Sequence, residues 1–361
     1  MTPALARAAA IGCAALSALT VSAFAQPASA AGPWHTVPLP FFWPNAHLAD
    51  VEAEAADKVW VAGGQGSFCI QWFPMTPCAA SSDGNPVVRR WNGSGWTEYP
   101  VNGWSGQGRM QRVAAGGGEV WARGYSFTTG QYLAKFDGSA FVPAAPPGSG
   151  ELGLLRAGAA GTWASTTSAA VDHLFRRTGT GWTPSEVPAS LKYIGDLQAR
   201  TADDVWAVGQ TYPDHATYGV EDVPAIAHWN GTSWTSVPAP TQEPAATERV
   251  LKVAPAGPDD VWAITFKSLI HWNGGSWTVI PVPETTAELK NVVVDGAGTP
   301  WVVMSNTADG LRYRLYRYTG AWEQVPVPST TSVSDIDAVP GAGTVWGVGS
   351  NDRWPAAFTN G

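Results

Sequence analysis

The chain has 361 residues, of which 45% are hydrophobic and only 14% are charged, with 40 Gly, 29 Pro and 20 Trp. This many turn-forming residues exclude a long helical protein and favour many short strands, arranged either in several ordinary domains or in one ring of repeats. Lys and Arg number 21 against 29 Asp and Glu, so the net charge of −8 argues against a nucleic-acid partner.

Residues 1–30 have the pattern of a cleaved secretory signal. One basic residue, Arg7, precedes an apolar stretch from Ala8 to Ala25, and small residues follow at 28–30. We therefore expect a secreted, extracellular protein in which residues 31–361 form a single domain. No later stretch has the roughly 18 consecutive apolar residues of a membrane span, so none is expected.

The cysteines divide between the signal and the mature chain. Cys13 lies inside the apolar stretch, and a lipoprotein anchor at this residue is the alternative to a cleaved signal. Cys69 and Cys78 remain as an even pair, which in an exported chain predicts a disulfide in preference to a metal site or a reactive thiol. On the chain-entropy model such a bridge contributes roughly 2–3 kcal/mol and stiffens one long loop.

One Trp-centred phrase recurs along the chain. Clear copies are Lys-Val-Trp-Val-Ala-Gly at 58–63, Asp-Asp-Val-Trp-Ala-Val-Gly at 203–209, Asp-Asp-Val-Trp-Ala-Ile at 259–264 and Thr-Val-Trp-Gly-Val-Gly at 344–349, and degenerate copies surround Trp121, Trp163 and Trp301. A second phrase follows each copy, as in His-Trp-Asn-Gly-Thr-Ser-Trp-Thr at 228–235, but only six of these are complete. Seven repeats of roughly 47 residues predict an all-β, seven-bladed β-propeller of four-stranded antiparallel blades.

The incomplete seventh repeat predicts how the ring closes. The chain ends at Phe358-Thr-Asn-Gly361, in register with His-Trp-Asn-Gly of the other repeats, and the segment Trp34 to Pro38 supplies the hairpin strand that should come next. We expect residues 34–38 to pair with residues 357–360, which leaves no open sheet edge in the ring.

The fourth repeat illustrates the expected blade. Alternation, β-branched and aromatic residues, and turn signals predict strands over 194–199, 205–209, 225–229 and 234–238. An Asn-Gly turn joins the last two, as expected for a tight hairpin.

The Trp-rich phrases resemble the tectonin-type propeller repeats of secreted lectins. The similarity is clearest in Thr-Val-Trp-Gly-Val at 344–348 and in His-Leu-Phe-Arg-Arg-Thr-Gly-Thr-Gly-Trp at 173–182. It extends over the mature chain as a repeat pattern and implies a secreted propeller that binds sugars. The Trp-Asn-Gly turn and the uneven repeat spacing depart from that pattern.

The long, variable loops fall on one face of the expected ring, which we call the loop face: residues 64–86, 102–109, 210–223 and 240–248. Repeated tryptophans such as Trp206 are predicted to pack between blades. Seven aromatic residues outside the repeated positions map to the loop face: Trp43, Trp72, Phe73, Trp104, Tyr212, Tyr218 and Trp354. There they would stack on sugar rings or anchor a protein partner, and the alternative is that they fold back over the loops.

The innermost strands predict a polar channel. If the apolar residues of each first strand face the blades, the alternate residues face the centre of the ring. These are Asp50, Glu52, Arg112, Arg156, Asp196, Asp335 and Asp337. Four carboxylates from the seventh and first blades converge and would suit Ca²⁺, but salt bridges to Arg112 are the favoured prediction, with no metal or cofactor.

The sequence contains no Gly-x-Ser-x-Gly, no His-Glu-x-x-His and no Asp-rich calcium loop. The favoured function is therefore a non-catalytic protein that binds cell-surface or extracellular polysaccharide through its loop face. One alternative is a secreted glycan-active hydrolase or lyase that uses the channel carboxylates. Another is a docking surface for other secreted proteins.

Overall fold

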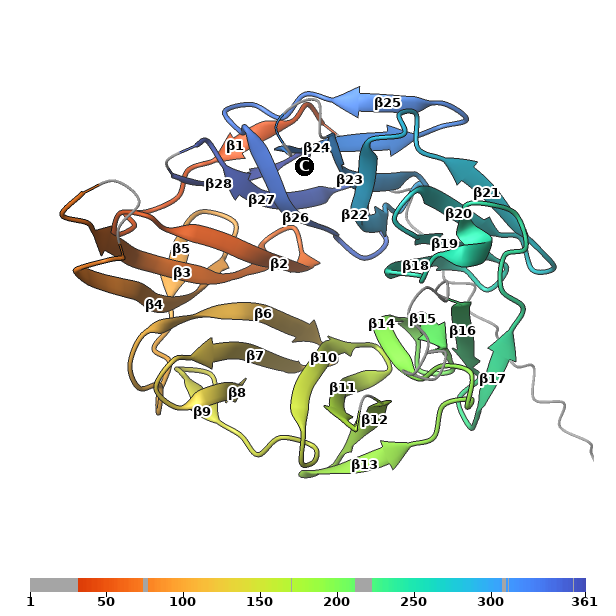
Figure 1. Cartoon of the computed structure of the whole chain (residues 1–361), viewed down its shortest axis with the longest axis horizontal. Coiled ribbons are helices and arrows are strands. Elements are labelled where there is room, and N and C mark those ends of the chain that lie inside the picture. The colour runs from red at the N-terminus through yellow and green to blue at the C-terminus, as the bar shows by residue number, and fades with distance from the viewer. Residues whose placement is uncertain are drawn as a thin grey trace, which may run out of the picture.

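The computed structural model describes residues 32–73, 77–169, 171–211, 223–306, 310, 312–352 and 354–361. These residues form seven four-stranded antiparallel sheets arranged as a ring (Figure 1). The predicted all-β, seven-bladed propeller is confirmed. Within the described residues there is no helix long and apolar enough to cross a membrane.

The blades follow one another along the chain, each from its innermost to its outermost strand. Blade 1 comprises β2 (His47–Ala55), β3 (Lys58–Ile70), β4 (Ala80–Trp91) and β5 (Trp96–Glu98). Blade 2 comprises β6 (Gly108–Gly116), β7 (Glu119–Ser126), β8 (Gly130–Phe136) and β9 (Phe141–Pro143). Blade 3 comprises β10 (Glu151–Gly158), β11 (Gly161–Ser168), β12 (Val171–Thr178) and β13 (Gly181–Ser185). Blades 4 and 5 comprise β14 (Tyr193–Thr201), β15 (Asp204–Thr211), β16 (Val223–Trp229) and β17 (Trp234–Val237), then β18 (Lys252–Gly257), β19 (Asp260–Ile264), β20 (Ser268–Trp272) and β21 (Trp277–Pro281). Blades 6 and 7 comprise β22 (Ala287–Val294), β23 (Pro300–Asn306), β24 (Arg312–Tyr318) and β25 (Trp322–Val325), then β26 (Ser332–Ala338), β27 (Val345–Ser350), β28 (Pro355–Thr359) and β1 (His35–Val37).

The N-terminal strand closes the ring as predicted. Strand β1 pairs antiparallel with β28, with His35 opposite Thr359 and Val37 opposite Ala357. Trp34 packs edge-on against Trp301 of blade 6, with 5.4 Å between ring centroids, so the closing segment also joins two blades. The chain ends therefore complete one blade together (Figure 1).

The second-strand tryptophans fill the space between blades, as predicted. Trp60, Trp121, Trp163 and Trp206 are among the largest fully buried side chains, and Trp301 and Trp346 are also buried. The indole N–H of Trp206 donates to Asp204 at 2.9 Å, and His228 lies 2.8 Å from the same carboxylate. In blade 4 the acid at the start of the second strand thus accepts from the tryptophan two residues later. Blade 5 differs: Trp262 is half-buried, its indole N–H has no hydrogen-bond partner among the described residues, and Asp260 contacts His271 at 2.7 Å.

A β-bulge recurs at one position of the innermost strand in six of the seven blades. In blade 4 it lies between Ile194 and Asp196, opposite Gly209. A Cβ at Gly209 would lie 1.8 Å from the carbonyl oxygen of Tyr193, so the final glycine of the Val-Trp-Ala-Val-Gly phrase is needed for this close approach. Blades 3 and 6 have Thr166 and Met304 at this position and keep the bulge, so the glycine is required by the close approach in blade 4 and not by the bulge itself.

The opposite face of the ring carries short turns. In blade 4 the Asn230 carboxamide oxygen accepts from the backbone N–H groups of Thr232 and Ser233, both at 3.0 Å. Gly231 between them has φ +94°, the left-handed conformation that the Asn-Gly turn requires. The turns between first and second strands are two residues long in blades 1 to 5 but span 295–299 in blade 6 and 339–344 in blade 7, so the prediction that all length variation falls on the loop face is wrong.

Candidate functional site

The most distinctive structure on the loop face is a long hairpin formed by β3 and β4 of blade 1. The two strands remain paired as far as Ile70 and Ala80, beyond the usual blade length. Near its tip a disulfide joins Cys69 and Cys78, with a Cα separation of 5.4 Å. The predicted bridge therefore closes a loop that contains Trp72 and Phe73.

Large aromatic side chains are exposed around this hairpin. The exposed fractions are 79% for Trp72, 71% for Phe73, 61% for Trp43 and 45% for Trp354, and Phe41 lies edge-on to Trp43 with 5.6 Å between ring centroids. All five come from loops of blades 7 and 1. We call this set, Phe41, Trp43, Trp72, Phe73 and Trp354, the aromatic surface.

The aromatic surface includes a shallow hollow where blades 7 and 1 meet. The hollow has a volume of about 450 Å³ and is lined by Trp354 on one side and by Pro44 to Ala46 on the other. The backbone N–H of Trp43 donates to the Gln65 carboxamide at 3.1 Å, which ties this loop to the second strand of blade 1. The exposed rings are therefore held on a fixed support.

The remaining predicted loop aromatics differ from this group. Trp104 is half-buried, lies edge-on to Tyr132 with 5.2 Å between ring centroids and donates from its indole N–H to the carbonyl of Gly106 at 3.0 Å. It follows the alternative prediction, in which the ring folds back over its own loop. Tyr212 and Tyr218 lie outside the described residues.

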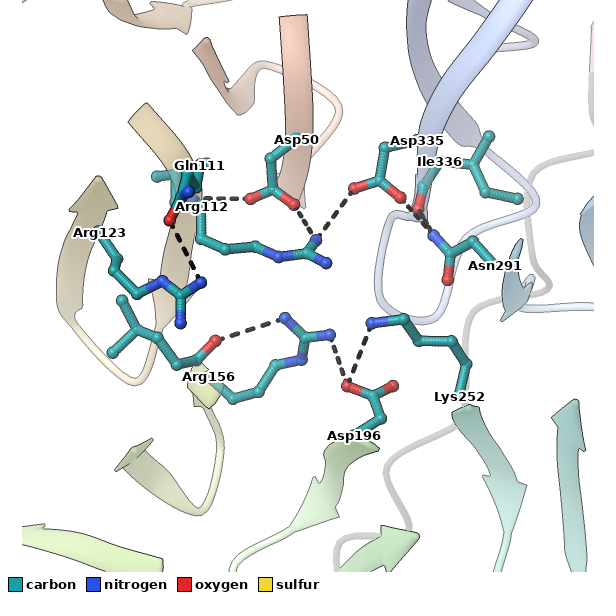
Figure 2. A network of polar contacts seen from close by, with 12 residues as sticks. Asp50, Gln111, Arg112, Arg123, Arg156, Asp196, Lys252, Asn291, Asp335 and Ile336 are labelled. Carbon is teal, nitrogen blue, oxygen red and sulfur yellow. Dashed lines mark hydrogen bonds and ion pairs between the residues drawn. The ribbon is translucent and has the colours of Figure 1, made fainter. Parts of the chain in front are cut away.

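The channel side chains lie at successive levels along the channel, and the strand register shows which residues share a level. Glu52, Arg156 and Asp337 each lie opposite a second-strand tryptophan and occupy one level. The level nearer the loop face holds the residues two positions earlier in each blade, which are Asp50, Arg112, Leu154, Asp196, Lys252, Asn291 and Asp335. Figure 2 shows that the polar members of this level and Arg156 point toward one another across the channel.

One cluster joins blades 1, 2, 6 and 7. Arg112 forms a short ion pair with Asp50 and lies 3.5 Å from Asp335, whereas Asn291 donates to Asp335 at 2.6 Å (Figure 2). Asp50 also accepts from the backbone N–H of Val113 at 2.7 Å. The predicted salt bridge to Arg112 is confirmed. Because the guanidinium occupies the space between the two carboxylates, Ca²⁺ there would have to displace it.

A second cluster joins blades 3, 4 and 5. Asp196 pairs with Arg156 at 2.5 Å and with Lys252 at 3.7 Å, and accepts from the backbone N–H of Val253 at 3.3 Å (Figure 2). Burial alone would raise the pKa of Asp196, but the charges of Arg156 and Lys252 lower it overall. Burial lowers the pKa of Lys252 to about 8.

The acids of blades 7 and 1 are less well compensated. Burial, followed by the charge of Asp50, raises the pKa of Asp335 to about 7, and burial raises that of Asp337 to about 7. Burial and the neighbouring Asp337 raise the pKa of Glu52 well above its ordinary range. Asp337 accepts from the backbone N–H of Ala53 at 2.7 Å, so this acid also ties neighbouring blades together. Among the described residues, no group of three His, Cys, Asp or Glu is placed to hold a metal ion.

A cavity of about 640 Å³ opens on the loop-face side of these clusters. Its lining comes from blades 2 to 6 and includes Arg112, Arg123, Arg156, Arg249, Lys252 and Lys290. Sequence reasoning identified only Arg112 and Arg156. Lys252 belongs to the blade without the bulge, Lys290 occupies the bulge of blade 6, and Arg123 lies on a second strand, so simple alternation along the first strands misses all three.

The search for relatives by sequence finds neither a matching family model nor a matching curated protein. Solved propellers are similar in structure. Virginiamycin B lyase from Staphylococcus aureus superimposes with a TM-score of 0.61 at 13% identity, covering 90% of this chain and 98% of that one. YCF48 bound to D1 peptide gives 0.56 at 14% identity, covering 92% and 98%. The WD40 β-propeller domain of Doa1 gives 0.57 at 11% identity, covering 90% and 96%. At such identities the similarity establishes the seven-bladed propeller fold and not a tectonin-type lectin.

Proposed function

We propose that this protein is an exported, non-catalytic binding protein that recognises extracellular or cell-surface glycan through the aromatic surface. The observation that carries this proposal is the exposure of Trp43, Trp72, Phe73 and Trp354 on loops of two adjoining blades. Soluble proteins seldom expose several large aromatic side chains together unless they bind something. Exposed indole and phenyl faces suit the apolar faces of sugar rings.

Export is supported by two features of different kinds. Residues 1–30 have the composition of a secretory signal, and the disulfide between Cys69 and Cys78 is of a type that persists in oxidising compartments. Glycan on a cell surface or in the surrounding matrix would be accessible to a protein in that compartment.

The channel acids favour a structural role over catalysis. Asp50, Asp196 and Asp337 each accept from a backbone N–H of the following blade, and Asp50 and Asp196 are also in ion pairs. A carboxylate that holds two blades together is not available to transfer a proton to a substrate. The glycan-active hydrolase or lyase is the weaker alternative, and it would depend on Glu52 and Asp335, whose pKa values burial raises.

A glycan array probed with the exported protein tests the proposal. We expect binding to one class of glycan, and we expect Trp43→Ala and Trp72→Ala to weaken it. Phe127→Ala is the matched control, because Phe127 is 65% exposed but belongs to the β7–β8 turn of blade 2. An array without binding, or equal losses in all three variants, would contradict the proposal.

Protein docking is a second candidate, favoured by the aliphatic and aromatic side chains on the hairpin itself. Phe68 and Ile70 are exposed on β3, and an exposed isoleucine is suited to a protein interface rather than to stacking on sugar. One solved propeller of similar structure is bound to a peptide. An Ile70→Ser variant separates the candidates: protein docking predicts loss of partner binding, whereas glycan binding predicts no change.

A further inference from the structure

The cavity on the loop-face side of the channel is unusual in its charge. Six cationic side chains and three carboxylates line it, in a chain that carries only 21 Lys and Arg against 29 Asp and Glu. Its volume of about 640 Å³ lies in the range typical of sites for small ligands. A positively charged hollow in an acidic protein will attract anions more strongly than the surrounding surface does.

Three of the six cations have no carboxylate partner among the described residues: Arg123, Arg249 and Lys290. The other three are held by the ion pairs of Asp50, Asp196 and Asp335. The cavity thus contains three cations held in ion pairs and three that make none within the described part of the chain, and it shares its lining with the carboxylates of Glu151, Asp172 and Glu288.

Arg123, Arg249 and Lys290 are positioned by contacts with aromatic rings and neutral polar groups, which do not neutralise their charge. The guanidinium of Arg249 lies over the ring of Phe266, 5.0 Å from its centroid, and the Lys290 ammonium lies 4.5 Å from the ring centroid of Tyr313. Arg123 donates to the carbonyl of Leu152 at 2.6 Å and to Gln111 at 3.3 Å. Aromatic rings and carbonyl groups orient a cation without neutralising it.

Part of this donor capacity is unused. The Nε atoms of Arg123 and Arg249 are buried and have no hydrogen-bond partner within the described structure. These two N–H groups are therefore free to donate to a ligand oxygen, although the Nε of Arg177, away from the cavity, is unpaired among the described residues as well. Burial, followed by the neighbouring Arg112, also lowers the pKa of Arg123 to about 10. Holding this side chain charged at the cavity therefore costs folding free energy.

We propose that this cavity binds a ligand carrying two or more carboxylate groups. The planar guanidinium group of Arg249 matches the geometry of a carboxylate, and Lys290 supplies a further point charge. Arg123, whose terminal nitrogens donate to Leu152, Gly153 and Gln111, adds positive charge beside them. Glu151 and Glu288 also line the cavity, so a ligand with separate carboxylates on an otherwise neutral frame fits better than one charged along its whole length. The site is distinct from the aromatic surface, and the inference does not depend on glycan binding there.

The carboxylates come either from a free polycarboxylic acid or from an acidic oligosaccharide, and calorimetric titration with citrate and with trigalacturonate distinguishes these sources. Maltotriose serves as the neutral control and sulfate as the anion without carboxylates. We expect at least one of the two carboxylate probes to bind, with an affinity that falls as NaCl is raised. We expect no binding of maltotriose and weaker binding of sulfate.

Two variants locate the site. Arg249→Gln and Lys290→Gln should each weaken binding of that probe roughly tenfold or more, the scale of losing one charged hydrogen bond. The matched control is Arg177→Gln, because Arg177 is also stacked on rings, 4.8 Å from the centroid of Trp121, but belongs to the outer part of blade 3. Both cavity variants should keep the melting temperature of the parent, since neither removes an ion pair.

Each outcome decides the proposal. Citrate binding identifies a free polycarboxylate as sufficient, and binding of trigalacturonate alone identifies an acidic sugar. The proposal is overturned if neither carboxylate binds, if sulfate or maltotriose binds as tightly, or if the cavity variants and Arg177→Gln retain equal affinity.

Discussion

The tryptophans of the second strands and those of the loop face have the same side chain in opposite surroundings. Trp206 and its equivalents recur once per blade; six of the seven are buried, Trp262 is half-buried, and in four blades the indole N–H donates to an acid of the same repeat. Trp43, Trp72 and Trp354 occur outside the repeat and are exposed on loops of blades 7 and 1. In this molecule the repeated tryptophans hold the blades together. The tryptophans outside the repeat lie on loops that are particular to blades 7 and 1.

The same distinction applies to charged residues. Asp50, Asp196 and Asp337 come from alternating positions of repeated strands, and each ties one blade to the next. Arg123 lies on a second strand and Lys290 in the bulge of blade 6, and both line the cavity without an ion pair to any described residue. Arg112, Arg156 and Lys252 occupy regular channel positions and line the same cavity, but ion pairs hold them.

The largest expected effect is on stability. Replacing Trp206 by Ala should lower the free energy of unfolding by about 3–5 kcal/mol, because it leaves a large cavity between blades. Urea denaturation measures this effect. Trp72→Ala is the control and should change stability by no more than about 0.5 kcal/mol. Similar losses in the two variants would break the distinction between buried and exposed tryptophans.

The channel acids should produce a pH-dependent effect of the next size. The pKa of Asp335 is raised to about 7 in the fold, above its unfolded value, so its contribution to stability is fully present below about pH 4 and is lost as the pH rises through about 7. Asp335→Asn, which resembles the protonated acid, should stabilise the protein relative to the parent by about 2–4 kcal/mol at pH 8 and much less at pH 4.

Denaturation at both pH values measures this difference. The exposed Asp137, whose pKa is lowered by the backbone N–H groups of Ala140 and Ser139, provides a comparison of opposite sign. If Asp335→Asn destabilises the protein equally at both pH values, the carboxylate form is required in the channel and its structural role as described here is wrong.

A smaller effect is expected from the disulfide, because it encloses Trp72 and Phe73 rather than the ring. Replacing Cys69 and Cys78 by Ser should weaken ligand binding at the aromatic surface by roughly 0.5–1.5 kcal/mol, since the loop must then be ordered on binding. The free energy of unfolding should fall by no more than the roughly 2–3 kcal/mol that the chain-entropy model gives such a bridge. Unchanged binding together with a large loss of stability would instead assign the bridge to the fold.

The sequence predicted the ring in detail because its signals are local and repeated. The phrase around Trp206, the Asn230-Gly231 turn and the missing hairpin strand at the C-terminus specified the blade, its outer turn and its closure. The alternation of the first strands also placed Arg112 beside Asp50.

The candidate sites could be predicted only in part. Whether a loop aromatic folds back is decided by contacts between loops, so the sequence did not separate the half-buried Trp104 from the exposed Trp72. The cavity cations were missed for different reasons: Lys290 lies in a bulge, Arg123 lies on a second strand, and Lys252 belongs to the blade without the bulge. Aligning all seven first strands on the residue opposite the tryptophan would have placed Lys252 at the level of Asp50.

The most direct test of the account is to measure affinity and stability on the same samples of the parent, Trp43→Ala and Trp72→Ala, with a glycan identified on the array. If the exposed rings form the binding site, each replacement should weaken binding by roughly 1–3 kcal/mol, the scale of losing an aromatic contact. The free energy of unfolding should stay within about 0.5 kcal/mol of the parent value. Equal affinity in parent and variants, or a loss of affinity matched by a loss of stability, would contradict the claim that these exposed rings form the binding site.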